Sequence, residues 1–389
     1  MNKKKKMCCI TTVDLTQRAF VADAMYQFVD KGYDVTLVCD DTARLKRERG
    51  DAFHYVDMPM QRGVSLKDIL LMPWKFRSFF KREKFDYIQY ATPNASLYAS
   101  IGGWLAGVPV RLYCQWGIRY VGNEGVMRKV LKSLEHLTCK LSTDICPASQ
   151  KNLEYAVSEG LYKAEKAAII GNGGTIGVDL SKYDLTKKDE YREEIFEKYP
   201  VLKDKIVFCS IGRLSRDKGS FELLEAFLKL AKEREDVALL MIGDSEGEWP
   251  DHVQDAKNHE RVVFSGYTNE VNKYVSAADV LVHPSYREGF SMVIQEAMAM
   301  GLAVVTTDIP GPSEVIEKDV TGILVEARST ESLLEGMKQM IAEPERMKQM
   351  GVAGRKRCEE LFNRERMLRL TYEHRTGLMN KGVFYKLTY

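Results

Sequence analysis

The sequence of 389 residues lacks the patterns that mark disulfide frameworks, zinc sites and membrane spans. Its eight cysteines include no Cys-x-x-Cys pair, and no cysteine–histidine group has zinc-ligand spacing. Several cysteines stand in strand-like apolar runs, which is typical of reduced core residues in a cytosolic protein. No stretch of about 20 apolar residues occurs, so the sequence predicts no transmembrane helix.

The N-terminus and the charge pattern argue against further classes. The start, MNKKKKMCCITTV, is basic, but its apolar run is too short for a signal peptide, and we expect a cytoplasmic protein. No basic helix-turn-helix or zinc-finger pattern appears, which argues against nucleic-acid binding. Residues 1–180 carry an excess of basic residues and the remainder an excess of acidic ones. An anionic partner for the first half and an uneven scatter of solvated charges explain this bias equally well.

Both halves of the chain alternate strand-like and helix-like patterns. An apolar run at 7–13 precedes a helical pattern at 18–31 and a strand pattern at 33–39. Apolar runs separated by helices indicate parallel strands that are covered on both faces and joined by right-handed crossovers. The second half repeats this alternation. The sequence therefore predicts an α/β protein with two Rossmann-like domains.

Composition suggests where these domains meet. Residues 181–204 are rich in charged residues and poor in large aliphatic ones, as in an exposed helix and linker. We expect an N-terminal domain at 1–180, a C-terminal domain at 205–365 and a final helix or tail at 366–389. Return of this last segment to the N-terminal domain is one option.

The first candidate motif is Ile211-Gly-Arg-Leu-Ser-Arg-Asp-Lys-Gly219, between a predicted strand and a predicted helix. Backbone N–H groups at a helix start favour anions, and Arg213 and Lys218 add charged donors. The motif suits a diphosphate. Ordinary surface bases near a loop are the competing interpretation.

The second candidate motif runs from Pro284 to Glu296, after another predicted strand. Glu288 lies in the turn and Glu296 on the following helix, and Gly289 lets the backbone approach a ligand closely. Four N–H groups begin the helix and form an anion cradle: those of Phe290, Ser291, Met292 and Val293. A third loop, Ser265-Gly-Tyr-Thr-Asn269, offers Tyr267 to a base, although an ordinary turn is an equal alternative.

These motifs resemble the C-terminal domain of family 4 (group 1) glycosyltransferases. The similar runs are GRLSRDKG, GYTNEV, PSYREGFSMVIQEAMAMGLAVVTTDIPGPSEVI and TGILV, and the two glutamates match that family's E-x7-E motif. In the first half, ATPNASLYASIGGWLAGVPVRLYCQWGIR and GNGGTIGVDLSKYD are more loosely similar to the bacterial capsule, exopolysaccharide and lipid-linked oligosaccharide branch. The resemblance implies the GT-B fold, in which two Rossmann-like domains face an interdomain cleft. It also implies a retaining reaction with a nucleoside-diphosphate sugar as co-substrate, no cofactor and no metal.

The resemblance assigns roles to the motif residues. Arg213 and Lys218 hold the donor diphosphate and stabilise its leaving charge, Glu288 contacts the donor sugar, and Glu296 binds the ribose hydroxyls. Tyr267 lies near the base. The remaining donor-binding residues are Gly212, Gly289, Phe290, Ser291 and Met292. Such chemistry depends on positioning and leaving-group stabilisation, with front-face attack by the acceptor.

Two departures from the family pattern lie in the first half. The segment 11–18 stands where the family has a Gly-Gly loop, and Trp116 stands where it has a histidine. The tryptophan puts an acid/base role in this half in doubt and indicates a different donor sugar or a stacking contact with the acceptor. The candidate acceptor residues are Thr12, Gln115, Trp116 and Arg119.

The predicted reaction transfers a hexose or N-acetylhexosamine, with UDP-sugars favoured, to a glycan or undecaprenyl-diphosphate-linked acceptor in surface polysaccharide biosynthesis. Residues 72–84 interleave aromatic and basic side chains, which suits contact with an anionic membrane, such as the inner face of the plasma membrane. A helix with its aromatics in the core is the alternative.

Other functions also remain open. A GT-B nucleotide-sugar epimerase has the same architecture, and a non-catalytic scaffold of a polysaccharide assembly complex is compatible with Trp116. A Rossmann dehydrogenase is disfavoured, because no Gly-x-Gly-x-x-Gly follows the first strand.

Overall fold

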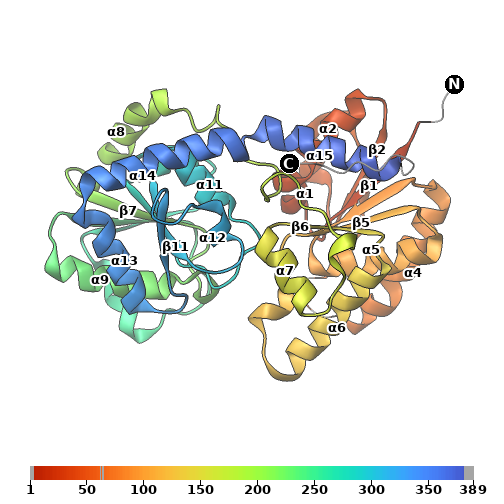
Figure 1. Ribbon diagram of the computed structural model, residues 1–389, viewed down its shortest axis with the longest axis horizontal. Coiled ribbons are helices and arrows are strands. Elements are labelled where there is room, and N and C mark those ends of the chain that lie inside the picture. Colours follow the sequence, from red (N-terminus) through yellow and green to blue (C-terminus); the bar gives the residue numbers. More distant parts are fainter. Residues whose placement is uncertain (1–3, 62, 64, 381–389) are drawn as a thin grey trace. The chain divides into compact units, whose positions relative to one another are not determined.

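The computed structural model describes residues 4–61, 63 and 65–380. They form two compact units (Figure 1). The first unit runs from the N-terminal part of the chain through Ile176 and also includes the residues from Glu365 onward. The second unit is Gly177–Arg364. Residues 181–204, predicted as an exposed helix and linker, are therefore part of the second unit.

The first unit is built on a six-stranded sheet with the order β3-β2-β1-β4-β5-β6, and every described pairing is parallel. Its strands are β1 (Lys6–Ile10), β2 (Asp34–Cys39), β3 (His54–Asp57), β4 (Tyr87–Tyr90), β5 (Val110–Gln115) and β6 (Asp144–Pro147). Alternate residues of β1 enter different cores: Met7 and Cys9 pack in one, and Cys8 and Ile10 in the other. The sheet is thus covered on both faces, as the apolar runs predicted.

Helices cover both faces of this sheet. They are α1 (Asp14–Phe20), α2 (Ala22–Asp30), α3 (Ala43–Arg49), α4 (Leu66–Glu83), α5 (Pro93–Ala106), α6 (Gly125–Leu141) and α7 (Gln150–Ser158), with short turns η1 (Gly50–Ala52), η2 (Arg119–Gly122) and η3 (Ala164–Lys166). The single helix predicted at 18–31 is wrong: helix begins at Asp14 and breaks at Val21, where ψ is −54° at φ −122°.

The last helix, α15 (Arg364–Met379), packs on the first unit, although it is far from it in sequence. In Figure 1 the blue α15 lies beside the red α2, and the rings of Phe28 and Tyr372 are 4.8 Å apart. Met367 of α15 is buried in the same core cluster as Phe28.

The second unit has the sheet order β12-β11-β10-β7-β8-β9, also parallel throughout the described pairings. Its strands are β7 (Ile206–Ile211), β8 (Val237–Ile242), β9 (Val262–Gly266), β10 (Val280–His283), β11 (Ala303–Thr307) and β12 (Gly322–Val325). The prediction of two parallel-sheet, Rossmann-like domains is confirmed.

The helices of the second unit are α8 (Lys188–Lys198), α9 (Ser220–Glu233), α10 (Val271–Ser276), α11 (Met292–Ala299), α12 (Pro312–Val315), α13 (Thr330–Ala342) and α14 (Pro344–Arg357). Shorter turns are η4 (Leu185–Lys187), η5 (Pro200–Leu202), η6 (Arg216–Lys218), η7 (Asp251–Asn258) and the π-helical η8 (Cys358–Phe362). α8 packs against α10 and buries Ile195 and Phe196.

All eight cysteines are buried and free, as expected for reduced core residues. None of the helices in the described ranges combines the length and apolar character needed to cross a bilayer.

Candidate functional site

The order of the second sheet reverses between β7 and β10. The chain leaves β7 toward β8 and β9 on one side, whereas β10 leads to β11 and β12 on the other. Ligands of open α/β sheets bind outside the carboxyl ends of the strands at such a switch point. The two strongest predicted motifs, Gly212–Gly219 and Pro284–Ser291, are the loops that follow these two strands.

Backbone contacts hold these loops together. Gly219 has φ +67°, and a Cβ built on it would lie 2.1 Å from the Pro284 carbonyl oxygen. Gly243, after β8, has φ +139°, and a Cβ there would lie 2.0 Å from the Gly212 carbonyl oxygen. Only glycine fits at either place, because any side chain would push the loops apart. The start of α9 is thereby fixed against the loop that leads into α11.

An ion pair between Lys218 and Glu288 joins the two loops. Lys218 Nζ lies 2.5 Å from Glu288 Oε1. Ser285 Oγ donates to the same oxygen at 3.0 Å, and His283 Nε2 lies 3.4 Å from it. Burial raises the pKa of Glu288, but the hydrogen bond from His283 and the charge of Lys218 outweigh it and hold that pKa well below its usual range. The carboxylate therefore stays ionised.

The start of α11 lies beside this ion pair. Ser291 is its N-cap, and Ser291 Oγ accepts from the Ile294 N–H at 3.4 Å and lies 3.2 Å from His283 Nε2. The side chain of Phe290 is buried and packs on Phe362, with the rings 5.5 Å apart. Phe290 can therefore offer a ligand its backbone but not its ring. Met292 is the first residue of the helix, and Gly289 is buried between Glu288 and Phe290.

Arg213 is more exposed than Lys218. Its side chain is 53% exposed, and it pairs with Glu246 and, at 3.6 Å, with Asp217. Glu246 follows β8, so this ion pair connects the loops after neighbouring strands. The guanidinium lies at the carboxyl edge of the sheet, where an anion can reach it.

Glu296 lies further along α11 in a different environment. Burial raises the pKa of its carboxyl, and the opposing influences of the Tyr183 hydroxyl and the positive charges of Lys182 and Arg364 do not cancel this effect. The two glutamates of the E-x7-E motif are thus shifted in opposite directions.

Tyr267 follows β9 and is 67% exposed. Its N–H donates to Asp244 Oδ1 at 3.0 Å, and its hydroxyl donates to Asn269 Oδ1 at 2.7 Å. These bonds hold an exposed ring at the carboxyl edge of the sheet, in the loop predicted to bind a base.

The first sheet has its own switch point, between β1 and β4. The Thr12 N–H donates to Thr92 Oγ1 at 2.9 Å, and the two hydroxyl oxygens are 2.8 Å apart. Thr92 holds φ at +69°, an unusual value for a residue other than glycine. Thr12 therefore lies at the switch point, with its polar groups engaged by a neighbouring loop.

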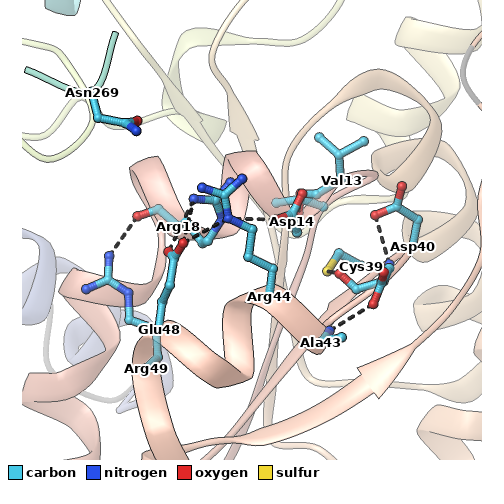
Figure 2. A network of polar contacts seen from close by, with 12 residues as sticks. Val13, Asp14, Arg18, Cys39, Asp40, Ala43, Arg44, Glu48, Arg49 and Asn269 are labelled. Carbon is cyan, nitrogen blue, oxygen red and sulfur yellow. Dashed lines mark hydrogen bonds and ion pairs between the residues drawn. The ribbon is translucent and has the colours of Figure 1, made fainter. Parts of the chain in front are cut away.

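The segment that replaces the family's Gly-Gly loop enters α1 directly. Arg18 Nε donates to Asp14 Oδ2 at 2.9 Å and Arg18 Nη1 to Glu48 Oε1 at 3.2 Å, as Figure 2 shows. Arg49 Nη2 donates to the Arg18 carbonyl oxygen at 3.0 Å, and Arg44 Nε reaches the Glu48 carboxylate at 2.9 Å. Side-chain bonds between α1 and α3 thus hold this segment in place.

Gln115 is buried, and both ends of its amide are engaged. Its Nε2 donates to Glu135 Oε1 at 2.6 Å, and its Oε1 accepts from the Tyr162 hydroxyl at 2.8 Å. The Tyr113 hydroxyl also donates to Glu135 Oε1, at 2.9 Å. Burial raises the pKa of Glu135 in spite of these two hydrogen bonds. Gln115 therefore belongs to a buried network below the carboxyl edge.

Trp116 and Arg119 follow β5 on different sides. The Trp116 ring is partly buried, with its centroid 5.8 Å from that of Phe20 on α1. Arg119 Nη1 donates to Asn94 Oδ1 at 3.4 Å. The Arg119 side chain also lines a small pocket, together with Tyr98 and residues of α6. Both lie at the carboxyl edge of the first sheet, and an acceptor role for them stays a prediction.

Sequence reasoning missed the polar residues that hold the predicted ones in place. His283 and Ser285 flank Pro284 and both contact Glu288, while Asp244 and Glu246 position Tyr267 and Arg213. The signal for His283 was its place at the end of an apolar strand. Among the described residues, no group of His, Cys, Asp and Glu side chains is arranged to hold a metal ion.

The comparisons with known proteins match both units. A model described as "Glycosyl transferase 4-like domain" matches residues 17–173, and one described as "Glycosyl transferases group 1" matches residues 191–357. The chain belongs to the group 1 (GT4) glycosyltransferases. It is thus a retaining glycosyltransferase, and the group 1 model covers the loops that carry Arg213, Lys218 and Glu288.

Two curated relatives extend over most of this glycosyltransferase. The capsular polysaccharide biosynthesis glycosyltransferase CapM of Staphylococcus aureus is 28% identical over 337 residues, covering 86% of this chain and 87% of the relative. The UDP-Gal:alpha-D-GlcNAc-diphosphoundecaprenol alpha-1,3-galactosyltransferase of Escherichia coli is 25% identical over 313 residues, covering 78% of this chain and 79% of the relative.

Solved structures show the fold of the glycosyltransferase. The Anabaena protein Alr3699/HepE, solved in complex with UDP, superposes with a TM-score of 0.77 at 18% identity, covering 96% of this chain and 100% of that one. WaaG, a glycosyltransferase involved in lipopolysaccharide biosynthesis, superposes with a TM-score of 0.73 at 15% identity, covering 97% and 100%. The likeness and the two parallel sheets show the GT-B fold.

Proposed function

We propose that this glycosyltransferase moves a hexose or N-acetylhexosamine from a UDP-sugar to a glycan acceptor carried on undecaprenyl diphosphate. The observation that carries the proposal is the Lys218–Glu288 pair at the switch point of the second sheet, between the starts of α9 and α11. Helix starts and cations together favour a diphosphate, and an ionised carboxylate favours sugar hydroxyls.

Arg213 and Lys218 are the proposed diphosphate ligands. Both lie in the loop after β7, and both are accessible, with 53% and 27% of their side chains exposed. As the bond from the anomeric carbon to the phosphate oxygen breaks, negative charge grows on that oxygen, and the two cations stabilise it. The acceptor hydroxyl forms the new bond on the same face and gives its proton to the leaving phosphate oxygen. Because these cations meet the diphosphate charge, the proposed reaction uses neither a divalent metal nor a cofactor.

The surroundings of the other residues in the donor site indicate the role of each. Glu288 is held ionised and accepts hydrogen bonds from the donor sugar, while the backbone at Gly289, Phe290, Ser291 and Met292 donates to the sugar and phosphate. Glu296 accepts from the ribose hydroxyls. Tyr267 offers an exposed ring to the base, and Gly212 lets the diphosphate approach the backbone.

The acceptor is proposed from the relatives and from the first unit. The names of the two curated relatives refer to capsular polysaccharide biosynthesis and to a diphosphoundecaprenol-linked sugar, respectively. Thr12, Trp116 and Arg119 lie at the carboxyl edge of the first sheet, where an acceptor sugar would bind. On this proposal the enzyme works at the inner face of the plasma membrane in surface polysaccharide biosynthesis.

Thermal stabilisation by nucleotides tests the donor. A ligand that binds only the folded protein raises its apparent stability in proportion to the logarithm of ligand concentration over Kd. We expect UDP and UDP-sugars to give the largest shift in Tm. A larger shift with GDP-sugars, or no shift with any nucleotide, would overturn the choice of UDP.

Turnover separates the proposed reaction from its rivals. We expect sugar transfer that depends on acceptor and is nearly lost in Glu288→Ala and Lys218→Ala. An epimerase would convert the nucleotide sugar without acceptor, and a scaffold would have no turnover to lose. Lys229→Ala is the matched control, because Lys229 lies on α9 but pairs with Glu225 and Glu331 away from the switch point.

A further inference from the structure

Two helices of the first unit expose clusters of apolar side chains that the fold does not use. The most exposed of these on α4 are Leu66, Leu70, Leu71 and Trp74, and on α6 they are Val126, Met127 and Val130. Leu66, Leu70 and Val126 are 76%, 69% and 78% exposed, and Trp74 is 57% exposed. We call these seven residues the α4/α6 surface. Single exposed apolar residues are ordinary on a protein surface, but clusters of them mark interaction sites.

The α4/α6 surface is continuous along each helix. Leu66, Leu70 and Trp74 follow one another at four-residue spacing and share one face of α4, and Val126 and Val130 do the same on α6. Helix α5 packs against both α4 and α6. A small pocket is lined by Ile69 of α4, Asn94 of α5 and Leu131 of α6, so helices α4 and α6 lie near one another.

The second half of α4 differs from the first. Residues 72–84 were predicted to meet a membrane through their aromatics, but Phe76, Phe79 and Phe80 are buried in the core. For these rings the alternative prediction, aromatics packed in the core, holds. Trp74 is the exposed aromatic of this segment, and it continues the stripe that begins at Leu66.

The charged residues around the α4/α6 surface indicate which kind of partner binds there. Lys67, Lys75 and Lys129 are exposed on the same turns of α4 and α6 as the apolar residues. Arg77 stacks on Trp74, with its guanidinium carbon 5.6 Å from the ring centroid. Apolar side chains with a tryptophan and a lysine rim fit the interface of an anionic bilayer, where apolar groups enter the acyl boundary and cations meet lipid phosphates.

The surface also lies at the edge where an acceptor would bind. α4 leads into β4 and α6 leads into β6, so in a parallel sheet both helices begin at its carboxyl edge. The seven residues of the α4/α6 surface occupy the first half of each helix. They therefore lie toward the edge that carries Thr12, Trp116 and Arg119.

We propose that the α4/α6 surface docks this enzyme on an anionic membrane and presents the carboxyl edge of the first sheet to a lipid-borne acceptor. The second part of this inference rests on the proposed function. The first part does not, because vesicle binding is measured without donor or acceptor.

The test compares a triple variant, Leu70→Ser/Val126→Ser/Trp74→Ser, with a matched control. Trp104→Ser is the control, because Trp104 is 54% exposed but lies near the end of α5, toward the other edge of the sheet. Binding is measured by flotation with vesicles of phosphatidylglycerol and phosphatidylcholine at low salt. We expect the triple variant to bind at least roughly tenfold more weakly than wild type, as loss of several buried apolar groups implies. Trp104→Ser should bind as wild type does.

A charge variant, Lys67→Glu/Lys75→Glu/Lys129→Glu, tests the lipid class. It should lose binding to phosphatidylglycerol vesicles and, like the wild type, bind pure phosphatidylcholine weakly. Wild type that does not float with phosphatidylglycerol vesicles, or a triple variant that floats as well as wild type, overturns the proposal. So does light scattering that shows a wild-type dimer and a monomeric triple variant, since the surface would then be an interface between copies.

Two further measurements keep this test apart from the proposed function. The Tm shift with UDP should be equal in wild type and the triple variant, which shows an intact second unit. Transfer to a short, water-soluble acceptor should be unchanged, whereas transfer to an acceptor embedded in phosphatidylglycerol vesicles should fall about as much as vesicle binding does. Equal loss on both acceptors would overturn the docking role even if the enzyme is the proposed transferase.

Discussion

The two sheets have the same strand topology but differ at their carboxyl edges. In the second unit, glycines bring loop backbones into contact and leave Arg213 and Lys218 accessible. In the first unit, the polar groups at the edge bond to one another, as Thr12 does with Thr92 and Gln115 with Glu135. A nucleotide diphosphate requires cations and open N–H groups at fixed places, whereas in the first unit the cation after β1, Arg18, is paired with Asp14 and Glu48.

Two glutamates with little exposed surface show the same difference. Glu288 faces Lys218 and His283, and its pKa is lowered. Glu135 has only the neutral donors Gln115 and Tyr113, and its pKa is raised by burial. One carboxylate is thus kept charged for contact with a ligand, and the other stabilises the structure of its unit through hydrogen bonds.

The largest expected effect is on the chemistry of the second unit. We expect Lys218→Ala to lower kcat by about a thousandfold, the cost of removing a donor aimed at developing negative charge. Single-turnover rates with saturating UDP-sugar measure it. Lys229→Ala should retain wild-type kcat. A loss of less than about tenfold in Lys218→Ala would mean that Arg213 and the helix starts carry the leaving group.

The next largest expected effect is on stability, and it comes from the backbone contact between Gly219 and Pro284. Gly219→Ala places a methyl group 2.1 Å from the Pro284 carbonyl oxygen at φ +67° and should lower the free energy of unfolding by about 3 kcal/mol. Gly160→Ala is matched in φ, at +72°, but meets no atom within 4 Å. It should cost about 1 kcal/mol. Urea unfolding measures both, and equal losses would show that the loops can move apart.

Disrupting the buried hydrogen-bond network around Gln115 in the first unit should lower stability by a smaller amount. It should leave the donor site of the second unit unchanged. Gln115→Leu removes the partner of the Tyr162 hydroxyl and one donor to Glu135, and should cost about 2 kcal/mol of unfolding free energy. The Tm shift with UDP should stay as in wild type. Gln150→Leu, at an exposed position of α7, is the control and should change stability by less than about 0.5 kcal/mol. A smaller UDP shift in Gln115→Leu would mean that the two edges are not independent.

The sequence predicted the second unit better because its signals are local. Gly212–Gly219 and Pro284–Ser291 each combine a strand end, glycine, charge and a helix start within a few residues, and the structure places both at one switch point. The contact between Lys218 and Glu288, which are 70 residues apart, could not be predicted this way. It depends on β7 and β10 being neighbours, and the strand order is not readable from periodicity.

The first unit was harder to predict because both faces of its sheet are buried. At the end of β5, Gln115 and Trp116 point to opposite faces, and alternation cannot tell which face holds a polar network when both are apolar. The same ambiguity affected α4. Its aromatics suggested an exposed basic-aromatic helix, yet Phe76 and Phe80 pack inward while Leu70 is exposed.

The smallest expected effect concerns pH, and it separates the two glutamates of the E-x7-E motif. As pH falls below neutral, Glu296, whose pKa burial raises, takes up a proton before an ordinary glutamate does, while Glu288 stays ionised. A neutral carboxyl is a weaker acceptor for ribose hydroxyls, so the affinity for a UDP-sugar should fall by about fivefold. Titration calorimetry with a UDP-sugar measures this, because its diphosphate does not titrate in that range. Glu296→Gln should bind more weakly and lose this pH dependence, whereas Glu288→Gln should keep it. If Glu296→Gln retains the full pH dependence, the titrating group lies elsewhere.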